Sequence, residues 1–499
     1  MSERAPLYDV AIVGMGPTGT SLANLLGAAG NSVLVLEKEA AIFPLPRAIH
    51  FDGEILRIFQ SAGLREEVLA ISRPGLQGMH FVNGAGDTML VRGGTAEFGP
   101  HGCASNYYFH QPELETVLRA GLTRFPNVEI RLQSEVVTIA QDDAAATLQF
   151  RSTPNGPLAM ARARYVVGCD GARSTLRQHI GSRMVDLGLR QPWLVFDVLL
   201  EQDLDLPGHT VQYCDPRRPM TYCNVVGRRR RWEIMVLPED DREALVRPES
   251  LWRLVAPWVR PDQARLERAA IYTFHSVIAD GWRRDRVLLA GDACHQTPPF
   301  LGQGMCAGIR DAANLAWKLQ TVLAGRATDG LLDTYESERK PHVRALIELA
   351  VRLGNLIQTT DITLAAVRDA EFKSGQPEIF ELPPQLLGAG AFDATPGSPA
   401  GRPFPQPRLA DGRLLDELLG RRCAVIGCQD VLAAAKPRTL ERWRRSEAVV
   451  IDRPPAAIDA WLKAHDARAV ILRPDRYIVG VARTGSDLDR ISQYLPVAP

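Results

Sequence analysis

The stretch Val10-Ala-Ile-Val-Gly-Met-Gly-Pro-Thr-Gly19 decides how the first part of this chain folds. Its first four residues form the short apolar run of a buried strand, and three glycines follow without a gap. The Leu- and Ala-rich segment 20–29 is typical of a helix, with Gly30 at its C-terminus. A second apolar run, 33–36, ends at Glu37. The pattern predicts a strand, a glycine turn, a helix and a second strand that ends in an acid.

Each part of this unit has a physical role in binding a dinucleotide. Gly14 permits the tight turn, Gly16 lets a pyrophosphate approach the backbone, and Gly19 lets the helix pack closely on the strand. The helix N-terminus faces the anion, and Glu37 is placed to accept hydrogen bonds from a ribose. The glycines alone would also fit an ordinary tight turn. The complete strand, turn and helix favour dinucleotide binding.

Two later segments repeat the pattern of a strand that ends in a polar turn. The first, Tyr165–Ser174, places Asp170 and Arg173 in its turn. The second ends at Asp292, where a doubly wound sheet presents its ligand crevice. A proline- and glycine-containing loop follows, and apolar residues then recur at helical spacing over 305–323. Either segment alone could be a core strand with its turn, but three such turns in one chain favour a shared ligand site.

Apolar stretches without helical period lie between these two turns. They are residues 194–200, 210–213, 220–226, 232–237 and 270–277, and we expect them to form a mostly antiparallel inserted sheet. The Arg228–Arg231 run fits a solvated turn that leads into one of these strands. Residues 331–370 are expected to be helical. The proline-rich segment 395–407 is expected to be an extended linker before a mixed α/β region.

Composition excludes several classes of protein. The 499 residues correspond to about three domains. Lys plus Arg and Asp plus Glu both total 58, so the charge indicates neither a nucleic-acid partner nor a membrane partner. No run reaches the roughly 18 apolar residues of a membrane span, and no export signal is visible. The eight cysteines contain no C-x-x-C pair and no spacing suited to zinc. We expect a cytoplasmic protein with free thiols and no metal site.

Several of these motifs resemble the single-component flavin aromatic hydroxylases, the group of para-hydroxybenzoate hydroxylase. The resemblance covers roughly residues 8–350. It rests on the glycine turn, on Cys169–Ser174 and on Gly291–Gly304, with further matches at Pro46–Ala48, His110–Leu114 and Tyr335–Pro341. The layout is most similar to the branch of 3-(3-hydroxyphenyl)propionate hydroxylase and phenol hydroxylase. Beyond residue 395, Leu472–Tyr477 resembles the thioredoxin-like C-terminal domain of phenol hydroxylases.

The resemblance implies an α/β fold in which a Rossmann-like FAD-binding domain carries an inserted, mostly antiparallel β-sheet that binds substrate. The implied divisions are 1–180 for the first part of the FAD-binding domain, with a substrate-domain excursion near 75–105; 181–279 for the substrate-binding sheet; 280–394 for the second part of the FAD-binding domain with a helical segment; 395–407 for the linker; and 408–499 for the thioredoxin-like domain. Four residues separate Cys423 from Cys428 instead of two, so the redox-active C-x-x-C turn is missing. A structural or dimer-contact role is therefore expected for this last domain.

The resemblance also implies FAD as cofactor and NADH or NADPH as co-substrate. The residues implied to bind FAD follow the cofactor from its diphosphate to its ring: Gly14, Gly16, Pro17, Thr18, Gly19, Glu37, Lys38, Arg47, Gln111, Asp170, Asp292, Pro299, Gly302, Gly304 and Met305. Asp170 and Arg173 would also meet the nicotinamide cofactor. Independently of the resemblance, backbone N–H groups at the start of the helix near residue 305 are fixed donors for the negative charge of a reduced flavin.

The implied reaction hydroxylates a small phenolic or related aromatic substrate with NAD(P)H and O2 through a flavin C4a-hydroperoxide. A phenol reacts better as its phenolate, so the site should help to remove the phenolic proton and should exclude water. The candidates for these contacts are His50, Tyr213, Tyr222 and His275, although each also fits an ordinary surface or core position. Asn224–Val226 stands where benzoate-type members carry an arginine, which disfavours a benzoate substrate.

Three other functions stay open at this point. One is an FAD- and NAD(P)H-dependent oxidoreductase of the quinone type, without oxygen insertion. Another is a non-catalytic flavin-binding protein that uses its last hundred residues for docking. An ordinary NAD dehydrogenase would explain the first motif and leave Gly291–Gly304 without a purpose. His295 is expected to be structural, and family likeness suggests a homodimer.

Overall fold

The computed structural model describes residues 6–153, 156–372, 377–382 and 386–497. An eight-stranded sheet holds the N-terminal strand at its centre. Its parallel strands run in the order β18 (Val287–Leu289), β11 (Ala159–Gly168), β1 (Leu7–Val13), β2 (Val33–Leu36) and β8 (Val128–Arg131). β17 (Arg283–Arg284) pairs with β18, while β10 (Ala146–Arg151) joins β11 and β9 (Glu135–Gln141) in antiparallel register. The central strands are buried on both faces, which explains their continuous apolar runs.

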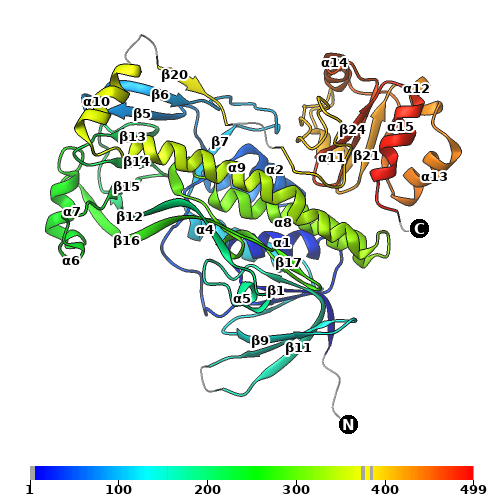
Figure 1. The fold of residues 1–499 in the computed structure, drawn as a ribbon, viewed down its shortest axis with the longest axis horizontal. Helices are drawn as coiled ribbons and strands as arrows, with labels where there is room; N and C mark the ends of the chain where they lie inside the picture. The colour runs from blue at the N-terminus through cyan, green and yellow to red at the C-terminus, as the bar shows by residue number, and fades with distance from the viewer. Residues whose placement is uncertain (1–5, 154–155, 373–376, 383–385, 498–499) are drawn as a thin grey trace.

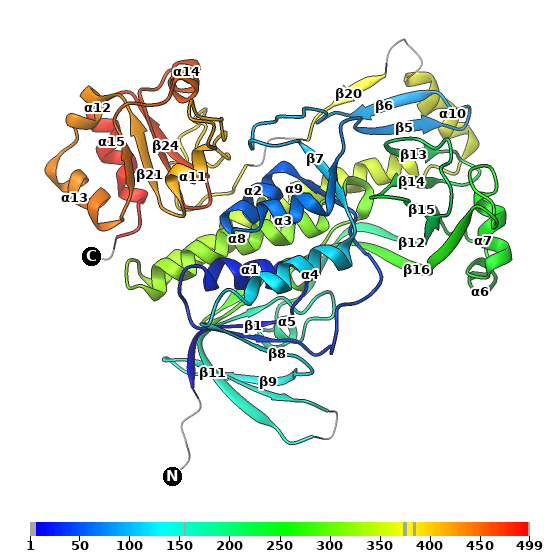
Figure 2. The ribbon, with the colours of Figure 1, turned by 180° about the vertical axis from the view of Figure 1, so that it is seen from behind.

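Helices cover one side of this sheet, and the β9–β11 hairpins extend from the other (Figures 1 and 2). α1 (Pro17–Gly27) packs against α4 (Gln111–Leu122) and against α8 (Gly304–Leu323), which in turn contacts α2 (Gly53–Ser61) and α9 (Asp333–Ile357). α3 (Arg65–Ala70) packs on α2, and α5 (Thr175–His179) packs on β9, β11 and β18. A small sheet of β3 (His50–Asp52), β7 (Asn106–Phe109) and β4 (Ser72–Pro74) lies beside them. The first half of α8 lies against the start of α1, since a Cβ on Gly308 would lie 2.3 Å from Thr18 Oγ1.

A nine-stranded sheet forms the second layer. Its order is β19 (His295–Gln296), β16 (Ala264–Ala279), β12 (Met184–Leu200), β15 (Arg229–Met235), β14 (Met220–Asn224), β13 (Thr210–Cys214), β5 (Met79–Asn83), β6 (Thr88–Arg92) and β20 (Glu378–Phe380). Most neighbours are antiparallel, but β13–β5 and β6–β20 are parallel. All five strands expected in the insertion are present. α6 (Arg242–Leu245), α7 (Pro248–Val255) and α10 (Ile362–Glu371) lie around this sheet.

One expectation about this sheet is wrong. Three of the four arginines in Arg228–Arg231 belong to β15 and not to a solvated turn, and Arg231 is only 2% exposed. The reason is a buried partner, because the Arg231 guanidinium pairs with Asp197 on the neighbouring strand β12. A run of like charges stays in solvent only when the fold brings no opposite charge to it.

The C-terminal region has the thioredoxin-like topology that the sequence predicted. Its sheet order is β22 (Val449–Ile451), β21 (Ala424–Gly427), β23 (Ala469–Leu472) and β24 (Ile478–Ala482), with β21–β22 parallel and the other pairs antiparallel. Its helices are α11 (Leu415–Leu419), α12 (Gln429–Ala433), α13 (Pro437–Arg445), α14 (Ala456–Ala464) and α15 (Gly485–Ile491). In Figures 1 and 2 this domain lies at the end of the molecule away from the nine-stranded sheet.

The proline-rich segment before this domain is extended and also packed. Phe404 and Gln406 are buried. The Phe404 N–H donates to the carbonyl of Arg476, and the Gln406 N–H donates to the carbonyl of Pro100. The segment therefore holds the C-terminal domain against the FAD-binding region.

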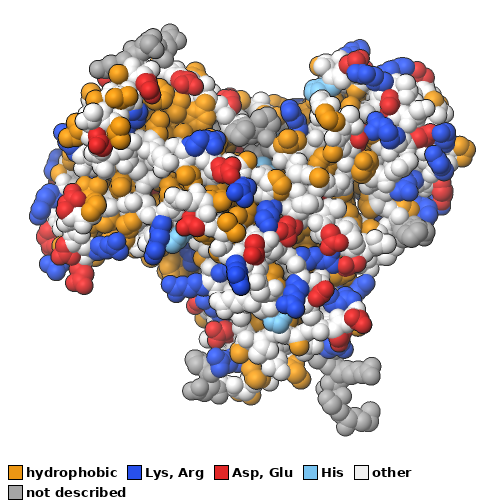
Figure 3. All heavy atoms as spheres, in the orientation of Figure 1, with side chains coloured by type: hydrophobic (Ala, Val, Ile, Leu, Met, Phe, Trp, Pro, Cys, Tyr) orange, Lys and Arg blue, Asp and Glu red, His pale blue; other side chains and the backbone are white. Residues whose placement is uncertain are grey.

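The molecular surface has mixed charge. Figure 3 shows lysines and arginines interspersed with acids over one face, in agreement with the equal charge totals. Among the described residues, no helix combines the length and apolar character that crossing a bilayer requires.

Candidate active site

The glycine turn between β1 and α1 has the geometry that a diphosphate site needs. Gly14 has φ +99°, and a Cβ there would lie 2.4 Å from the carbonyl oxygen of Cys169. A Cβ on Gly19 would lie 2.1 Å from the carbonyl oxygen of Gly14. A Cβ on Gly16, in contrast, would meet no atom within 4 Å. Gly14 and Gly19 are therefore required by the protein itself, whereas Gly16 leaves open space for a ligand.

Glu37 lies against this turn at the end of β2. Its carboxylate accepts hydrogen bonds from the Met15 N–H (2.7 Å) and the Glu39 N–H (2.8 Å). The adjacent Lys38 is exposed and lies 3.9 Å from the Glu39 carboxylate. The structure thus places Glu37 at the turn and directs Lys38 to solvent.

A cavity of about 380 Å³ connects this turn with the nine-stranded sheet, a volume typical of small-molecule sites. Ten of the residues implied to bind FAD line it: Gly16, Pro17, Thr18, Arg47, Gln111, Asp292, Pro299, Gly302, Gly304 and Met305. These residues come from five separate parts of the chain, and the fold brings them to one trough. Gly14, Gly19, Glu37, Lys38 and Asp170 do not line the cavity.

The middle of the trough is held by Gln111 and Asp292. The Gln111 Oε1 accepts from the N–H groups of Arg47 (3.0 Å) and Ala48 (2.7 Å), and so fixes the backbone of that loop. Protein surrounds Asp292 and raises the pKa of its carboxyl, yet the side chain is open to the cavity. No described residue donates a hydrogen bond to this carboxylate. An open, unpartnered carboxylate fits a ligand hydroxyl, such as those on the ribityl chain of FAD.

The far end of the trough is formed by the loop that leads into α8. Gly302 has φ +63°, so a residue with a side chain would be strained there. Gly304 begins α8, and both Gly304 and Met305 line the cavity. The first N–H groups of a helix have no intrahelical acceptor. The end of the trough therefore offers fixed backbone donors, which fits the electron-rich edge of a flavin ring.

His50 faces the same end of the trough. Its Nε2 lies 2.8 Å from Asn106 Oδ1, and its Nδ1 lies 3.4 Å from the Gly302 carbonyl. Asn106 donates its amide to Gly94, so its Oδ1 is an acceptor. As the shortest contact of His50 it favours the proton on Nε2, against the Arg92 guanidinium, which lies 3.2 Å from the same nitrogen. The lone pair is then on Nδ1, beside Gly302.

The charge state of His50 follows from its surroundings. Burial, together with the positive charge of Arg92, lowers the pKa of His50 to about 4. The Arg92 guanidinium donates to Asn106 Oδ1 (2.9 Å) and to the Leu301 carbonyl (2.8 Å). His50 is therefore neutral at physiological pH and serves as an acceptor.

Asp170 caps helix α5 with one carboxylate oxygen, and its other oxygen is buried without a partner among the described residues. Its carboxylate accepts from the N–H groups of Thr175 (2.7 Å) and Leu176 (3.2 Å), at the start of α5. Burial raises the pKa of this carboxyl. Its neighbours Cys169 and Gly171 line the cavity instead, and Arg173 is exposed.

Only one of the three remaining candidates for a substrate contact lines the cavity on the side of the nine-stranded sheet. Half-buried His275 lines it, but Tyr213 and Tyr222 do not. Tyr222 is buried on the opposite face of the sheet, where its hydroxyl donates to the Pro207 carbonyl (3.1 Å), and Tyr213 packs on Trp258. Side chains alternate along a strand, so one residue of offset moves a side chain to the other face.

The residues that do face the cavity from this sheet were missed by the sequence analysis. They are mostly polar: Thr210, Gln212, Thr221, Cys223, Arg231, Glu233, Arg268 and Tyr272. On β13, β14 and β15 they alternate with apolar residues, and that period of two was the available signal. Tyr108 also lines the cavity and hydrogen bonds to Thr210 Oγ1 (2.7 Å).

Four of the groups near this wall form a cluster of opposite charges. The Arg231 guanidinium donates to both Asp197 oxygens (2.6 and 3.0 Å) and lies 3.6 Å from Glu233. Arg268 lies 3.5 Å from Asp197. Burial raises the pKa of the Glu233 carboxyl. Both arginines pair with Asp197, so neither is left as an unpaired cation for an anionic substrate.

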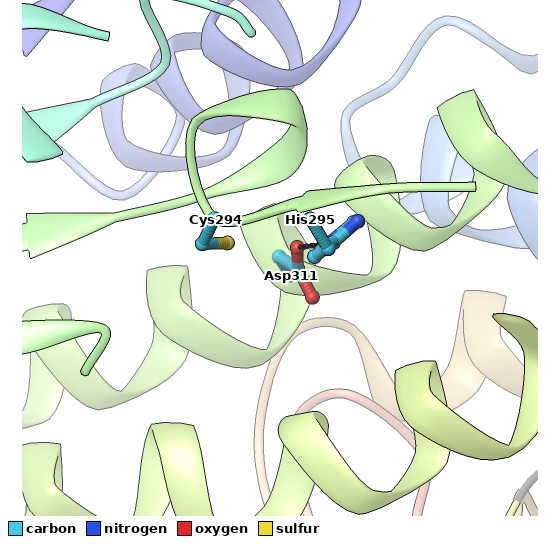
Figure 4. A group of neighbouring side chains, drawn as sticks. All are labelled: Cys294, His295 and Asp311. Atoms are coloured by element: carbon cyan, nitrogen blue, oxygen red, sulfur yellow. Dashed lines mark hydrogen bonds and ion pairs between the residues drawn. The ribbon is translucent and has the colours of Figure 1, made fainter. Parts of the chain in front are cut away.

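A second buried cluster lies near the turn at Asp292. Cys294, His295 and Asp311 approach one another closely enough to hold a metal ion (Figure 4). His295 Nε2 lies 2.6 Å from one Asp311 oxygen, and the Arg339 guanidinium donates to the other (2.8 Å). Burial keeps the pKa of the Cys294 thiol well above its ordinary value. Both Asp311 oxygens and the Cys294 thiol, which donates to the Gly291 carbonyl, are therefore engaged, which favours a structural role for His295. His295 Nδ1 has no partner among the described residues.

Comparison with known proteins agrees with this geometry. The family model described as FAD binding domain matches residues 7–350. The chain belongs to this family. A second model, described as HcaD C-terminal domain, matches residues 401–496.

Similar proteins cover nearly the whole chain. A probable NADH-specific resorcinol 4-hydroxylase of Rhodococcus jostii is 40% identical, over 98% of this chain and 95% of its own. A 3-(3-hydroxy-phenyl)propionate/3-hydroxycinnamic acid hydroxylase of Burkholderia vietnamiensis is 37% identical, over 94% and 93%. The solved structure of an aklavinone-11 hydroxylase with FAD and aklavinone has a TM-score of 0.80 at 22% identity, over 98% of this chain and 99% of that chain.

The predicted family, fold and cofactor are therefore confirmed. The chain is an FAD-dependent aromatic hydroxylase that uses NAD(P)H and O2. The oxidoreductase without oxygen insertion, the non-catalytic flavin protein and the NAD dehydrogenase are set aside.

Proposed function

We propose that this enzyme hydroxylates a small uncharged phenol of the resorcinol type, with NADH as the preferred reductant. The observation that carries the proposal is the cluster beside the cavity, in which Arg231 and Arg268 both pair with Asp197 and Arg231 also lies near Glu233. A substrate carboxylate would meet an acid there and no unpaired cation. The resorcinol hydroxylase of Rhodococcus supports this substrate class, and its NADH specificity supports NADH.

Bound FAD would supply the redox chemistry, which is hydride acceptance from NAD(P)H and the activation of O2. The chain's own residues would hold it along the trough, with the diphosphate at Gly16 and the ring beside Gly302 to Met305. Arg47 would neutralise phosphate charge, and Asp292 would accept from a ribityl hydroxyl. Pro299 and the apolar wall at Phe274 would help to exclude water from the ring.

His50 is the residue we propose to act on the substrate. Its neutral imidazole would accept the hydrogen bond of the phenolic hydroxyl at Nδ1 and raise the electron density of the aromatic ring. The Asn106 Oδ1, 2.8 Å from Nε2, favours this tautomer. His275 is the second candidate for a substrate contact, because it also lines the cavity.

A substrate panel tests the proposed substrate class. Purified holoenzyme is given NADH, 18O-labelled O2 and either resorcinol or 3-(3-hydroxyphenyl)propionate. We expect resorcinol to accelerate NADH oxidation and to yield a product with one labelled oxygen. We expect kcat/KM for the carboxylate at least about tenfold lower, a difference of about 1.4 kcal/mol. Equal or better use of the carboxylate would contradict the neutral-substrate proposal.

Replacing His50 tests its role separately. In His50→Gln the amide can still donate toward Asn106, but the acceptor beside Gly302 is lost. We expect product formation to fall by about 100-fold, with flavin reduction by NADH in the absence of phenol little changed. His275→Gln is the comparison variant, and we expect it to lose less than fivefold. A reversed order would transfer the role to His275.

We also propose that the enzyme works in the cytoplasm as a homodimer. The eight cysteines are free thiols, which supports a reducing compartment. The dimer rests on family likeness alone. Sedimentation of the holoenzyme at micromolar concentration tests it, and a monomeric mass would refute it.

A further inference from the structure

The turn Leu472–Tyr477 of the C-terminal domain has no role in the proposed chemistry, yet its polar side chains are buried. It connects β23 with β24. Arg473, Arg476 and Tyr477 are 2%, 3% and 5% exposed. Buried charged groups require partners. Three partners of this turn, Glu338, Trp317 and Glu54, lie outside its own domain.

One set of contacts fixes helix α8. Asp475 accepts from the Trp317 indole N–H (3.0 Å). The Arg473 guanidinium lies 2.9 Å from Glu338, which also accepts from Lys318 Nζ (2.8 Å). Trp317 and Lys318 lie on α8, so the turn sets the position of this helix. The first turn of the same helix, Gly304 and Met305, lines the cavity.

A second set of contacts continues to the cavity itself. The Tyr477 hydroxyl donates to Glu54 Oε1 (2.8 Å), and Glu54 Oε2 accepts from Arg310 Nε (2.5 Å). The same guanidinium donates to Asp52 (2.5 Å) and to the side-chain oxygen of Gln303 (3.0 Å). Gln303 stands between Gly302 and Gly304. Three consecutive hydrogen bonds therefore join the C-terminal domain to the loop at the ring end of the trough.

Because these contacts are buried, the loss of the single Tyr477 hydroxyl would disturb them. Glu54 and Arg310 are 6% and 3% exposed. Without the Tyr477 hydroxyl, one Glu54 oxygen loses its donor in a buried site. The Arg310 guanidinium would then shift toward Glu54, and its bond to Gln303 would weaken. A displacement of this size at a reactive centre changes rates strongly.

We propose that Tyr477 is a positioning residue for hydroxylation, acting through Glu54 and Arg310 on the loop Gly302–Gly304. The C-terminal domain thereby helps to determine how much NADH oxidation leads to oxygen insertion. The inference rests on the proposed placement of the flavin ring beside this loop.

Tyr477→Phe in the full-length holoenzyme tests the proposal. We expect normal FAD content, a shifted flavin absorbance band and at least a threefold lower yield of hydroxylated product per NADH, with more hydrogen peroxide. The matched control is Asp416→Asn, because Asp416 accepts from the Arg57 guanidinium (2.7 and 2.9 Å) across the same domain contact. No described contact joins Asp416 to Gln303. Asp416→Asn should lower the melting temperature at least as much and leave the product yield per NADH unchanged.

Three results would overturn the proposal. They are an unchanged yield in Tyr477→Phe, an equal loss of yield in Asp416→Asn, and a loss of yield without a change in the flavin spectrum. Met305→Ala separates this failure from failure of the ring placement. If Met305→Ala shifts the flavin spectrum and Tyr477→Phe does not, the ring is placed correctly and the role of Tyr477 is refuted. If neither variant shifts the spectrum, the placement itself is wrong.

Discussion

At the scale of single residues, the three glycines of the first turn show that identical side chains serve different needs. Gly14 and Gly19 are required because carbonyl oxygens occupy the space that a Cβ would take. Gly16 is required for the opposite reason, since the space beside it is open and lies in the trough. Gly14 and Gly19 are therefore required for folding, and Gly16 is required for ligand binding.

Substitution separates these two needs. In Gly16→Val the side chain would extend into the open trough, so we expect a folded protein whose FAD affinity falls on the order of 100-fold, or about 3 kcal/mol. Gly14→Ala should destabilise the fold by about 1 to 3 kcal/mol, because a Cβ at φ +99° is strained and meets Cys169. Flavin titration and thermal melting of the flavin-free proteins measure both effects. A melting temperature reduced equally in the two variants would contradict this assignment.

At the scale of elements, the substrate sheet also positions the cofactor loop. The Arg231 guanidinium on β15 donates to the backbone carbonyls of Pro46 (2.6 Å) and Arg47 (2.7 Å). Arg268 on β16 donates to the Pro46 carbonyl as well. Asp197 on β12 holds both arginines in place. Three adjacent strands therefore fix the loop that presents Arg47 to the trough.

Removing the central charge of this cluster, on Asp197, should weaken FAD binding. In Asp197→Asn, two buried arginines lose their shared partner, and we expect the FAD dissociation constant to rise about tenfold, with a loss of stability of about 3 kcal/mol. The control is Asp240→Asn, which breaks the Arg218–Asp240 pair in the same domain, away from the cavity. Its FAD affinity should stay at the wild-type value. Flavin fluorescence quenching measures both constants, and equal weakening in the two variants would refute the link.

At the scale of the whole molecule, buried titratable groups make stability depend on pH. Burial is the main cause that lowers the pKa of both His50 and His101 to about 4, from an ordinary value of 6.5. Arg473 and Lys318 lower the pKa of Glu338 to about 2, against the effect of burial. In each case the unfolded chain binds the proton at a higher pH than the folded chain does. The contribution of these three groups to stability is therefore complete above pH 6.5 and falls as the pH is lowered.

The melting temperature should follow this sequence of titrations. We expect little change between about pH 7 and pH 8, a decline between pH 6.5 and 4 from the histidines, and a further decline between pH 4.5 and 2 from Glu338. His101→Gln should flatten the first part of the decline, while replacement of the exposed His179 should leave it unchanged. Calorimetry across this range measures the effect. A constant melting temperature from pH 7 to pH 4 would contradict the titrations.

By itself, the sequence determined those parts of the structure that depend on residues close together along the chain. The glycine turn, the acid at the end of the second strand, the five strands of the insertion and helix α8 all follow from short-range patterns of turns and apolar spacing. The glycine turn of the cofactor site was predictable for the same reason, because its motif is contiguous and its role is carried by the backbone. Gly302 and Gly304, in contrast, were expected only from the family resemblance.

Only the tertiary structure decided the substrate half and the interdomain contacts. Tyr222 faces away from the cavity and Cys223 lines it, a difference that depends on which face of the sheet is covered. Arg231 is buried because Pro46, 185 residues earlier, and Asp197 are brought to it. Tyr477 meets Glu54 across 423 residues of sequence. Such contacts join charges that are solvated in the separate segments and become paired only when folding removes water from both.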